Sequence, residues 1–404
     1  MTTSAFKRLI AQKNLRSIWA AFWKASKKQR SFGVDGVTPA VFEQNWAANL
    51  ARLQTELERG YKFSNLRGHP IPKPDGRFRI ICIPTVSDRI VQRLLADHLV
   101  DRATQLGIAN SVSFGFIRSS SDEKKGVAAA RNRAVELRQS HNWAYKSDIS
   151  AFFDRIPRDS LLNQTVAALR SPSFSPILSG VIGCEIDAKD PKIVRIAKQN
   201  GIVNGLGVRQ GMPLSPLFAN IILRRFDAKM IDLGVPMVRY ADDFIAFADS
   251  EAKCREIDRI ARAELAKISL CLPPLDVPGS KTRIAEPSED MDFLGLALSR
   301  QSDGIYRLLI SEKQMEKIRR TLGNLKDVKQ LVADGLSIGD LGRRLDNSVD
   351  GYRAAYSSAQ NAAQLEGELA SIRISVMTSV FTQAFGAAAV SSSKAPFRQF
   401  MGLD

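Results

Sequence analysis

Apolar residues recur at helical spacing along several stretches of the chain, and short apolar runs bounded by turn residues separate them. Two of the helical stretches begin with a hydroxyl residue followed by proline, Thr38-Pro39 and Ser215-Pro216, which is typical of a helix start. Gly60 and Gly234 stand where two of the stretches end. The spacing predicts helices over residues 4–29, 38–60, 87–106, 215–234 and 311–332.

Short apolar runs predict strands in three further places. Residues 70–84 form two such runs around Asp75-Gly76, a turn signal that predicts a hairpin. Residues 144–148 predict a single strand that ends at Asp148. Residues 235–248 predict a second hairpin, with the acidic pair Asp242-Asp243 at its tip. Taken alone, this pair also fits an ordinary turn, because aspartate is common in turns.

The chain is long and unusually basic. Its 404 residues suit two or three packed subdomains, and its net charge is +16. Residues 1–100 hold 17 Lys and Arg against 7 Asp and Glu, so a large share of the excess lies at the N-terminal end. This distribution favours nucleic acid as the partner over a membrane surface. We find no lipidation motif, no apolar run of about 18 residues and no signal peptide, and therefore expect a cytoplasmic protein without membrane contact.

Cysteine and histidine do not indicate a metal site. The four cysteines form no CxxC pair, and the three histidines lie far apart in the sequence. Reduced thiols are the simple interpretation.

Two predicted strands carry acidic residues that suit divalent cations. Asp148 ends one strand, and Asp242 lies at the tip of the later hairpin. If these strands are neighbours, the two carboxylates could together hold two magnesium ions about 4 Å apart, as nucleotidyl transfer requires. The backbone carbonyl of Ile149 could add a further ligand. The alternative for Asp148 is a helix cap near a strand end.

The motifs around these acids resemble the polymerase core of reverse transcriptases. Asp148 with the aromatic residues after it is similar to the first acidic motif of that family. Gln210-Gly211, followed by Ser215-Pro216, is similar to the second, and Tyr240-Ala241-Asp242-Asp243 is similar to the signature tetrad. The blocks occur in the family's order.

The resemblance extends over residues 17–360 and narrows to prokaryotic enzymes of the group II intron-like clade. It rests on Phe32–Thr38, Ile71–Arg79, Ser113–Phe116, Lys281-Thr282, Phe293–Leu296 and Leu345–Tyr356. Ser120 and Ser121 stand where typical intron enzymes carry a basic residue. The DNA-binding and zinc-containing endonuclease domains of many such enzymes have no counterpart in this sequence.

The resemblance implies an α+β fold, the right-hand polymerase. We expect a helical N-terminal extension over 1–65, fingers over 66–143 and a palm with an antiparallel sheet over 144–300. An α-helical thumb and tail would follow over 301–404.

The resemblance also implies roles for individual residues. Asp148 and Asp242 would ligate both metal ions, Mg²⁺ or alternatively Mn²⁺, with Ile149 adding its carbonyl and Asp243 as a looser ligand. The residues expected at the incoming deoxynucleotide are Lys73, Arg77, Arg79, Phe153, Gln210, Gly211 and Lys281. Among these, Lys281 would protonate the pyrophosphate, and the ring of Phe153 would exclude a 2′-hydroxyl. Phe293, Leu294 and Gly295 would form the primer grip.

The implied function is RNA-directed DNA synthesis with an RNA template, a DNA primer or product and dNTPs. We expect a stand-alone enzyme that copies a dedicated structured noncoding RNA in bacterial anti-phage defence. The alternative is an intron maturase without an endonuclease, which binds and folds intron RNA. An RNA-templated RNA polymerase is disfavoured by Ala241 and Phe153, and a retron enzyme by Gly33–Gly36. The sequence leaves the oligomeric state open.

Overall fold

The computed structural model describes residues 4–27, 29–73, 76–121, 123–333 and 335–391. The chain divides into two compact units. Unit 1 comprises Met1–Ala130 and Trp143–Ile284, and unit 2 comprises Arg131–Asn142 and Ala285–Asp404. The division into extension, fingers, palm and thumb by residue range stays a prediction.

The N-terminal part of unit 1 is helical. Its helices are α1 (Ala5–Leu9), α2 (Gln12–Ser26), α3 (Pro39–Glu43), α4 (Trp46–Arg59) and α5 (Val86–Val100). Thr38 caps α3 as predicted, since its hydroxyl accepts the Val41 N–H at 3.3 Å. The helix predicted over 38–60 is in fact two, because Asn45 leaves the helical conformation between α3 and α4. Trp19 and Phe22 of α2 lie in the core of the unit.

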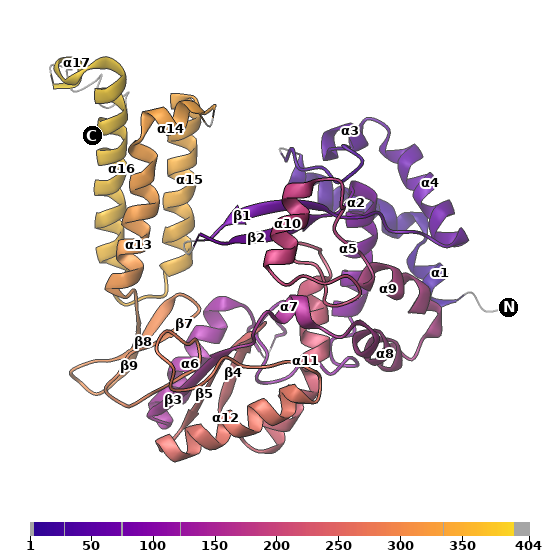
Figure 1. Cartoon of the computed structure of the whole chain (residues 1–404), viewed down its shortest axis with the longest axis horizontal. Helices are drawn as coiled ribbons and strands as arrows, with labels where there is room; N and C mark the ends of the chain where they lie inside the picture. Colours follow the sequence, from indigo (N-terminus) through magenta and orange to yellow (C-terminus); the bar gives the residue numbers. More distant parts are fainter. Residues whose placement is uncertain (1–3, 28, 74–75, 122, 334, 392–404) are drawn as a thin grey trace. The chain divides into compact units, whose positions relative to one another are not determined.

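The predicted hairpin after this region is present. β1 (Arg67–Pro72) pairs antiparallel with β2 (Phe78–Ile83), and Pro72 lies opposite Phe78. Of the predicted turn pair, Asp75 lies outside the described residues, whereas the Gly76 N–H donates to the Lys73 carbonyl at 3.1 Å. The hairpin packs against α10 (Pro191–Gln199), which lies beside it in Figure 1.

Unit 1 also contains a four-stranded sheet, in which the strands lie in the order β4-β5-β3-β6. Its strands are β3 (Trp143–Asp148), β4 (Met237–Tyr240), β5 (Asp243–Ala248) and β6 (Arg283–Ala285). β5 pairs antiparallel with both β3 and β4, and every residue from Phe244 to Ala248 is buried. α12 (Glu251–Ala266) covers β3 and β5, and α11 (Ser215–Asp232) packs on α12 (Figure 1).

The segment between β3 and α11 is helical. The hydrophobic pattern did not predict these helices. The segment contains α7 (Phe152–Arg155), α8 (Arg158–Leu169), a short 3₁₀ turn η1 (Pro172–Phe174), α9 (Ser175–Ile182) and α10. The start of α11 also differs from the prediction. Ser215 is the first helical residue and its hydroxyl donates to the Arg209 carbonyl at 2.7 Å, so it does not cap the helix.

Unit 2 combines a small sheet with long helices. β7 (Met291–Phe293), β8 (Leu296–Arg300) and β9 (Tyr306–Leu309) form an antiparallel sheet in sequence order. The helices are α6 (Val127–Ser140, from its fifth residue), α13 (Glu312–Gly323), η2 (Asn324–Lys326), α14 (Val328–Ala333), α15 (Ile338–Tyr356), α16 (Ala362–Phe385) and α17 (Ala387–Ser391). The helix predicted over 311–332 is interrupted because Asp327 adopts an extended conformation.

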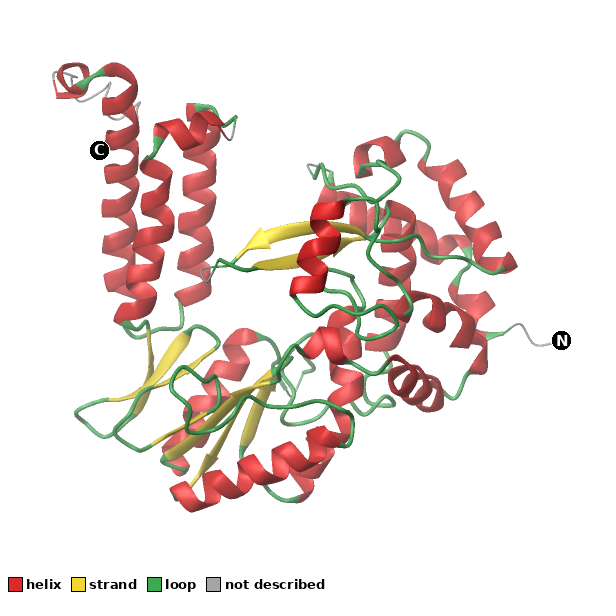
Figure 2. Cartoon of the chain, viewed as in Figure 1, coloured by secondary structure: helices red, strands yellow, loops and turns green. Residues whose placement is uncertain are grey.

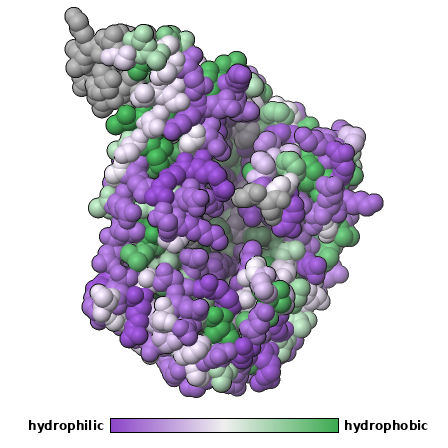
Figure 3. Space-filling model, turned by 60° about the vertical axis from the view of Figure 1, so that its left-hand side comes forward, coloured by the Kyte–Doolittle hydropathy of each residue, from purple (hydrophilic) through white to green (hydrophobic). Residues whose placement is uncertain are grey.

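The predicted α+β class is confirmed. Figure 2 shows helices together with separate antiparallel sheets. The face in Figure 3 is mostly hydrophilic, with apolar residues scattered among polar ones. Within the described part of the chain, no helix is long and apolar enough to cross a bilayer.

Candidate active site

The sheet of unit 1 brings the predicted acidic residues together. Asp148 at the end of β3 lies directly opposite Asp243 at the start of β5. Asp242 precedes Asp243 in the β4–β5 turn, and its carbonyl accepts the Ile149 N–H at 3.2 Å. Ala241 in this turn has a φ of 57°, a left-handed conformation that is unusual for a residue with a side chain. Three carboxylates from two paired strands therefore stand at one edge of the sheet.

Burial and the charges of neighbouring carboxylates raise the pKa values of two of these aspartates. Burial, followed by the charge of Asp148, raises the pKa of Asp242 to about 6. Burial also raises the pKa of Asp243 to about 6, although Lys146 opposes the shift. Asp243 Oδ1 is buried and accepts no hydrogen bond from the described residues. Crowded, partly dehydrated carboxylate oxygens are the ligands that Mg²⁺ prefers, so the donor set fits a divalent metal.

Two lysines contact the acidic residues. Lys281 Nζ pairs with Asp148 Oδ2, and Lys146 Nζ lies 3.5 Å from Asp243 Oδ1. No group of three or more Asp, Glu, His or Cys residues in the described ranges is arranged as a metal cage. Asp148 and Asp243 thus each have a lysine as neighbour, and the metal-ligand roles expected for Asp148, Asp242 and Asp243 stay a prediction.

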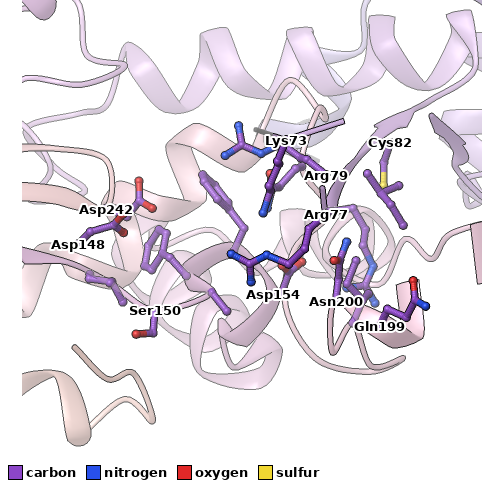
Figure 4. Close-up of a pocket in the computed structure, with 18 of the residues that line it drawn as sticks. Lys73, Arg77, Arg79, Cys82, Asp148, Ser150, Asp154, Gln199, Asn200 and Asp242 are labelled. Atoms are coloured by element: carbon purple, nitrogen blue, oxygen red, sulfur yellow. The ribbon is translucent and has the colours of Figure 1, made fainter. Parts of the chain in front are cut away.

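A cavity of about 530 Å³ opens beside this acidic edge, within unit 1. Asp148 and Asp242 stand at one end of it, and the cationic residues Lys73, Arg77 and Arg79 reach into it from the β1–β2 hairpin (Figure 4). Nine residues predicted from the sequence line the cavity: Lys73, Arg77, Arg79, Asp148, Ile149, Phe153, Gln210, Asp242 and Lys281. Carboxylates that could hold a metal ion and several cationic groups thus line one cavity, in which Lys281 contacts Asp148 and Asp154 lies near the basic residues. A lining of this kind suits a metal-bound polyphosphate.

Phe153 lies in the wall of this cavity on the short helix α7. The helix starts directly after Ala151, which has a φ of 47° and turns the chain sharply away from β3. The Phe153 ring stacks edge-on against Phe152 at 5.2 Å, and the Phe152 ring is fully buried. The buried ring supports the half-buried one, so Phe153 presents a fixed apolar surface to the cavity.

Gln210 and Gly211 are held close to the strand β2. The Cys82 N–H donates to the Gln210 carbonyl at 2.7 Å. Gly211 has a φ of +100°, and a Cβ atom there would lie 2.7 Å from the Cys82 carbonyl oxygen. Only glycine permits this close approach. Gln210 lines the cavity, whereas Gly211 acts through the backbone.

A charged cluster that the sequence patterns did not predict lies next to Gln210 in the chain. Arg209 is 1% exposed and pairs with Glu185, which also accepts Arg158 Nη1 at 2.7 Å and the Gly205 N–H at 2.8 Å. These contacts lower the pKa of Glu185 against the effect of burial. Arg209 also donates to the Val203 carbonyl at 2.9 Å. The cluster fixes the loop that carries Gln210.

A second missed cluster lies under the acidic turn. Arg239 and Asp227 are fully buried and form a bidentate pair, with Nε–Oδ1 at 2.7 Å and Nη2–Oδ2 at 2.5 Å. Arg239 also donates to the Ala241 carbonyl at 2.9 Å. Its remaining contacts are Asn220 Oδ1 at 3.1 Å and Ser113 Oγ at 3.0 Å. A single letter gives no sign that an arginine is buried, so the sequence held no clear indication of this network.

The predicted primer-grip residues belong to unit 2. Phe293 ends β7 and is fully buried, and Leu294 and Gly295 form the turn into β8. Gly295 lines a cavity of about 390 Å³ together with residues of α13, three of them basic: Lys313, Lys317 and Arg320.

Comparison with known proteins identifies the family. A family model described as reverse transcriptase (RNA-dependent DNA polymerase) matches residues 71–298, more than half of the chain. Protein YkfC of Escherichia coli K12 is 28% identical over 222 residues, covering 54% of this chain and 55% of that protein. The COX1/OXI3 intron 2 protein of Saccharomyces cerevisiae is 25% identical over 206 residues, covering 50% of this chain and 22% of that protein.

The chain thus spans about half the length of YkfC and about a fifth of the yeast protein. Among solved structures, telomerase from Candida tropicalis in complex with a fragment of telomeric RNA aligns over 91% of this chain and 61% of its own. That alignment has a TM-score of 0.43 and 16% sequence identity. Since the family model spans the acidic residues and the cavity beside them, this chain belongs to the reverse transcriptase family of RNA-dependent DNA polymerases.

Proposed function

We propose that this protein is an RNA-directed DNA polymerase whose active site is the cavity beside Asp148 and Asp242. The observation that carries the proposal is that these two carboxylates lie close enough for the charge of one to act on the other, in a cavity that the basic residues Lys73, Arg77 and Arg79 also line. The family match supports the reaction class.

Each residue has a distinct task in this reaction. Asp148 and Asp242, with the carbonyl of Ile149, would hold the divalent metal ions. Bound there, two such ions activate the primer hydroxyl and stabilise the leaving pyrophosphate. Lys73, Arg77 and Arg79 neutralise the triphosphate, and Lys281 Nζ donates a proton to the pyrophosphate. Gln210 and the backbone at Gly211 position the nucleotide.

Phe153 supports a preference for deoxynucleotides. Its ring is held from behind by the buried Phe152 and cannot retreat without disturbing the core. A ribose 2′-hydroxyl pressed against it would meet both a steric clash and an apolar surface that offers no hydrogen bond.

Primer extension on an RNA template tests the proposal. We expect wild-type protein with Mg²⁺ to extend a DNA primer with dNTPs, and a chelator to stop the reaction. Asp148→Asn and Asp242→Asn should each lower the rate at least a hundredfold, because metal binding is lost. Asp249→Asn, which changes an exposed aspartate, is the matched control. Extension that is equally fast with Asp242→Asn would reject the proposed site.

The template is the finer part of the proposal. We propose a structured noncoding RNA, copied in a bacterial anti-phage defence, as the biological substrate. Sequencing of RNA and DNA that copurify with the protein tests this. One dominant structured RNA with complementary DNA is expected, and a random sample of cellular RNA would contradict it.

An intron maturase is the second candidate, and one observation favours it. Two of the similar yeast proteins are named as intron proteins. A maturase would bind and fold intron RNA, and this function would survive Asp242→Asn. Splicing of a flanking intron in the presence of that variant would favour the maturase.

A further inference from the structure

The turn between β7 and β8 has a conformation that its sequence disfavours. Phe293 pairs with Leu296, so Leu294 and Gly295 form a two-residue hairpin loop. Their φ values are 50° and 87°, and both therefore lie in the left-handed region. Such loops strongly prefer Asn-Gly, because a bulky side chain at the first position is strained. Leucine stands at that first position, so the turn needs support from outside its own two residues.

Arg131 on α6 supplies this support. Arg131 is 6% exposed, and its guanidinium donates twice to the Leu294 carbonyl, from Nε at 3.1 Å and from Nη2. The third contact runs from Nη1 to the Ala355 carbonyl at 2.7 Å. Ala355 is next to the last residue of α15, where carbonyls have no partner within the helix. One planar side chain thus ties the turn to the end of a helix.

The connection continues to the wall of the cavity beside α13, which three basic and two acidic residues line: Lys313, Lys317, Arg320, Asp292 and Glu316. The Arg131 guanidinium lies 5.9 Å from the centre of the Tyr356 ring, and the Tyr356 hydroxyl accepts Gln314 Nε2 at 2.7 Å. Gln314 belongs to α13 and lines the cavity beside Gly295, Lys313 and Lys317. Arg131 therefore sets the position of the turn relative to the basic residues that face the same cavity. All of these residues lie within unit 2.

We propose that Arg131 is a positioning residue for the primer strand. It holds the Leu294-Gly295 turn at a fixed distance from the basic face of α13, so that both contact the same stretch of primer backbone. This inference rests on the proposed polymerase function. Arg131 touches neither nucleotide nor primer and acts only through Leu294. Its loss should weaken binding of the primed template and leave the handling of dNTPs intact.

The test uses Arg131→Lys, since lysine keeps the charge but lacks the planar set of donors that lets arginine hydrogen-bond to both the Leu294 and the Ala355 carbonyl. We expect the KM for primed template to rise about tenfold, while kcat and the KM for dNTPs stay within about twofold. Arg133→Ala, on the exposed face of the same helix, should change none of them.

A further variant separates positioning from folding. Arg138→Lys also removes a buried arginine of α6, one that donates to the Leu298 and Glu289 carbonyls. It should lower the melting temperature without raising the KM for primed template. A melting-temperature loss in Arg131→Lys without a rise in the KM for primed template would overturn the proposal.

The two hypotheses can fail separately. Wild-type protein that incorporates no dNTP would reject the proposed function. The Kd of a fluorescent primed duplex, measured without nucleotides for wild type and Arg131→Lys, still decides the role of Arg131. Equal Kd values would reject it.

Discussion

The buried pair Arg239–Asp227 offers a sharp test of how the acidic turn is held. Arg239→Met keeps much of the side-chain volume but removes five hydrogen bonds: two to Asp227 and one each to Ser113, Asn220 and Ala241. Asp227 would remain fully buried, and Asn110 Nδ2, at 3.1 Å, would still donate a hydrogen bond to it. An uncompensated buried charge of this kind costs about 3–5 kcal/mol.

We therefore expect Arg239→Met to lower the free energy of unfolding by about 3–5 kcal/mol, measured by urea denaturation. Lys253→Met, which breaks an exposed pair with Asp249, is the control and should cost less than about 1 kcal/mol. Combining Arg239→Met with Asp227→Leu removes both charges and should recover most of the loss.

Activity should respond differently from stability. The double variant still lacks a donor for the Ala241 carbonyl, so the left-handed turn that presents Asp242 loses its support. We expect primer extension by the double variant to remain at least tenfold slower than by the wild-type protein, although its free energy of unfolding recovers. A loss below about 1 kcal/mol in Arg239→Met, or full activity in the double variant, would refute the reasoning.

Three further predictions follow from the site and the core. Phe153→Ala should raise the relative use of NTPs over dNTPs about tenfold or more, measured as a ratio of kcat/KM values, and an unchanged ratio would contradict the steric role. Gly211→Ala should raise the KM for dNTPs and cost about 1–3 kcal/mol, whereas Gly201→Ala, at a φ of +69° with open space around it, should cost about 1 kcal/mol and spare the KM. Burial lowers the pKa of His98 to about 4, so on acidification His98 takes up a proton in the unfolded chain before it does so in the folded protein. The free energy of unfolding should therefore fall by about 1 kcal/mol from pH 7 to pH 5. His98→Gln should flatten this pH dependence in urea denaturation, and an unchanged slope would speak against it.

Local patterns were enough to predict the strands that carry the acidic residues. The runs at 144–148 and 235–248 became β3 and the β4–β5 hairpin, and Asp242 stands in the turn as expected. Their pairing was a hypothesis from the chemistry of a shared metal site and from the resemblance, because the alternation within one strand does not identify the neighbouring strand.

The buried charged contacts that support the candidate site could not be predicted from the sequence. Glu185, Arg209 and Arg239 each carry a charge, and a charged residue usually lies at the surface. Their burial depends on partners that the fold brings close, such as Glu185 for Arg209 and Asp227 for Arg239. Periodicity describes one element at a time, so it cannot reveal a pair that joins two different segments of the chain.

The side chain of Asn200 donates to the Phe78 carbonyl at 2.8 Å, and these residues are 122 positions apart in the sequence. Both belong to the region where the end of α10 closes the cavity beside Asp148 against β2. Joining such distant segments carries an entropic cost and slows folding. During synthesis on the ribosome, a chain that has emerged only as far as β3 holds the residues of the β1–β2 hairpin but not α10, against which the hairpin packs. The proposed active-site cavity would still lack this wall, so nucleotide binding should begin only after α10 has been made.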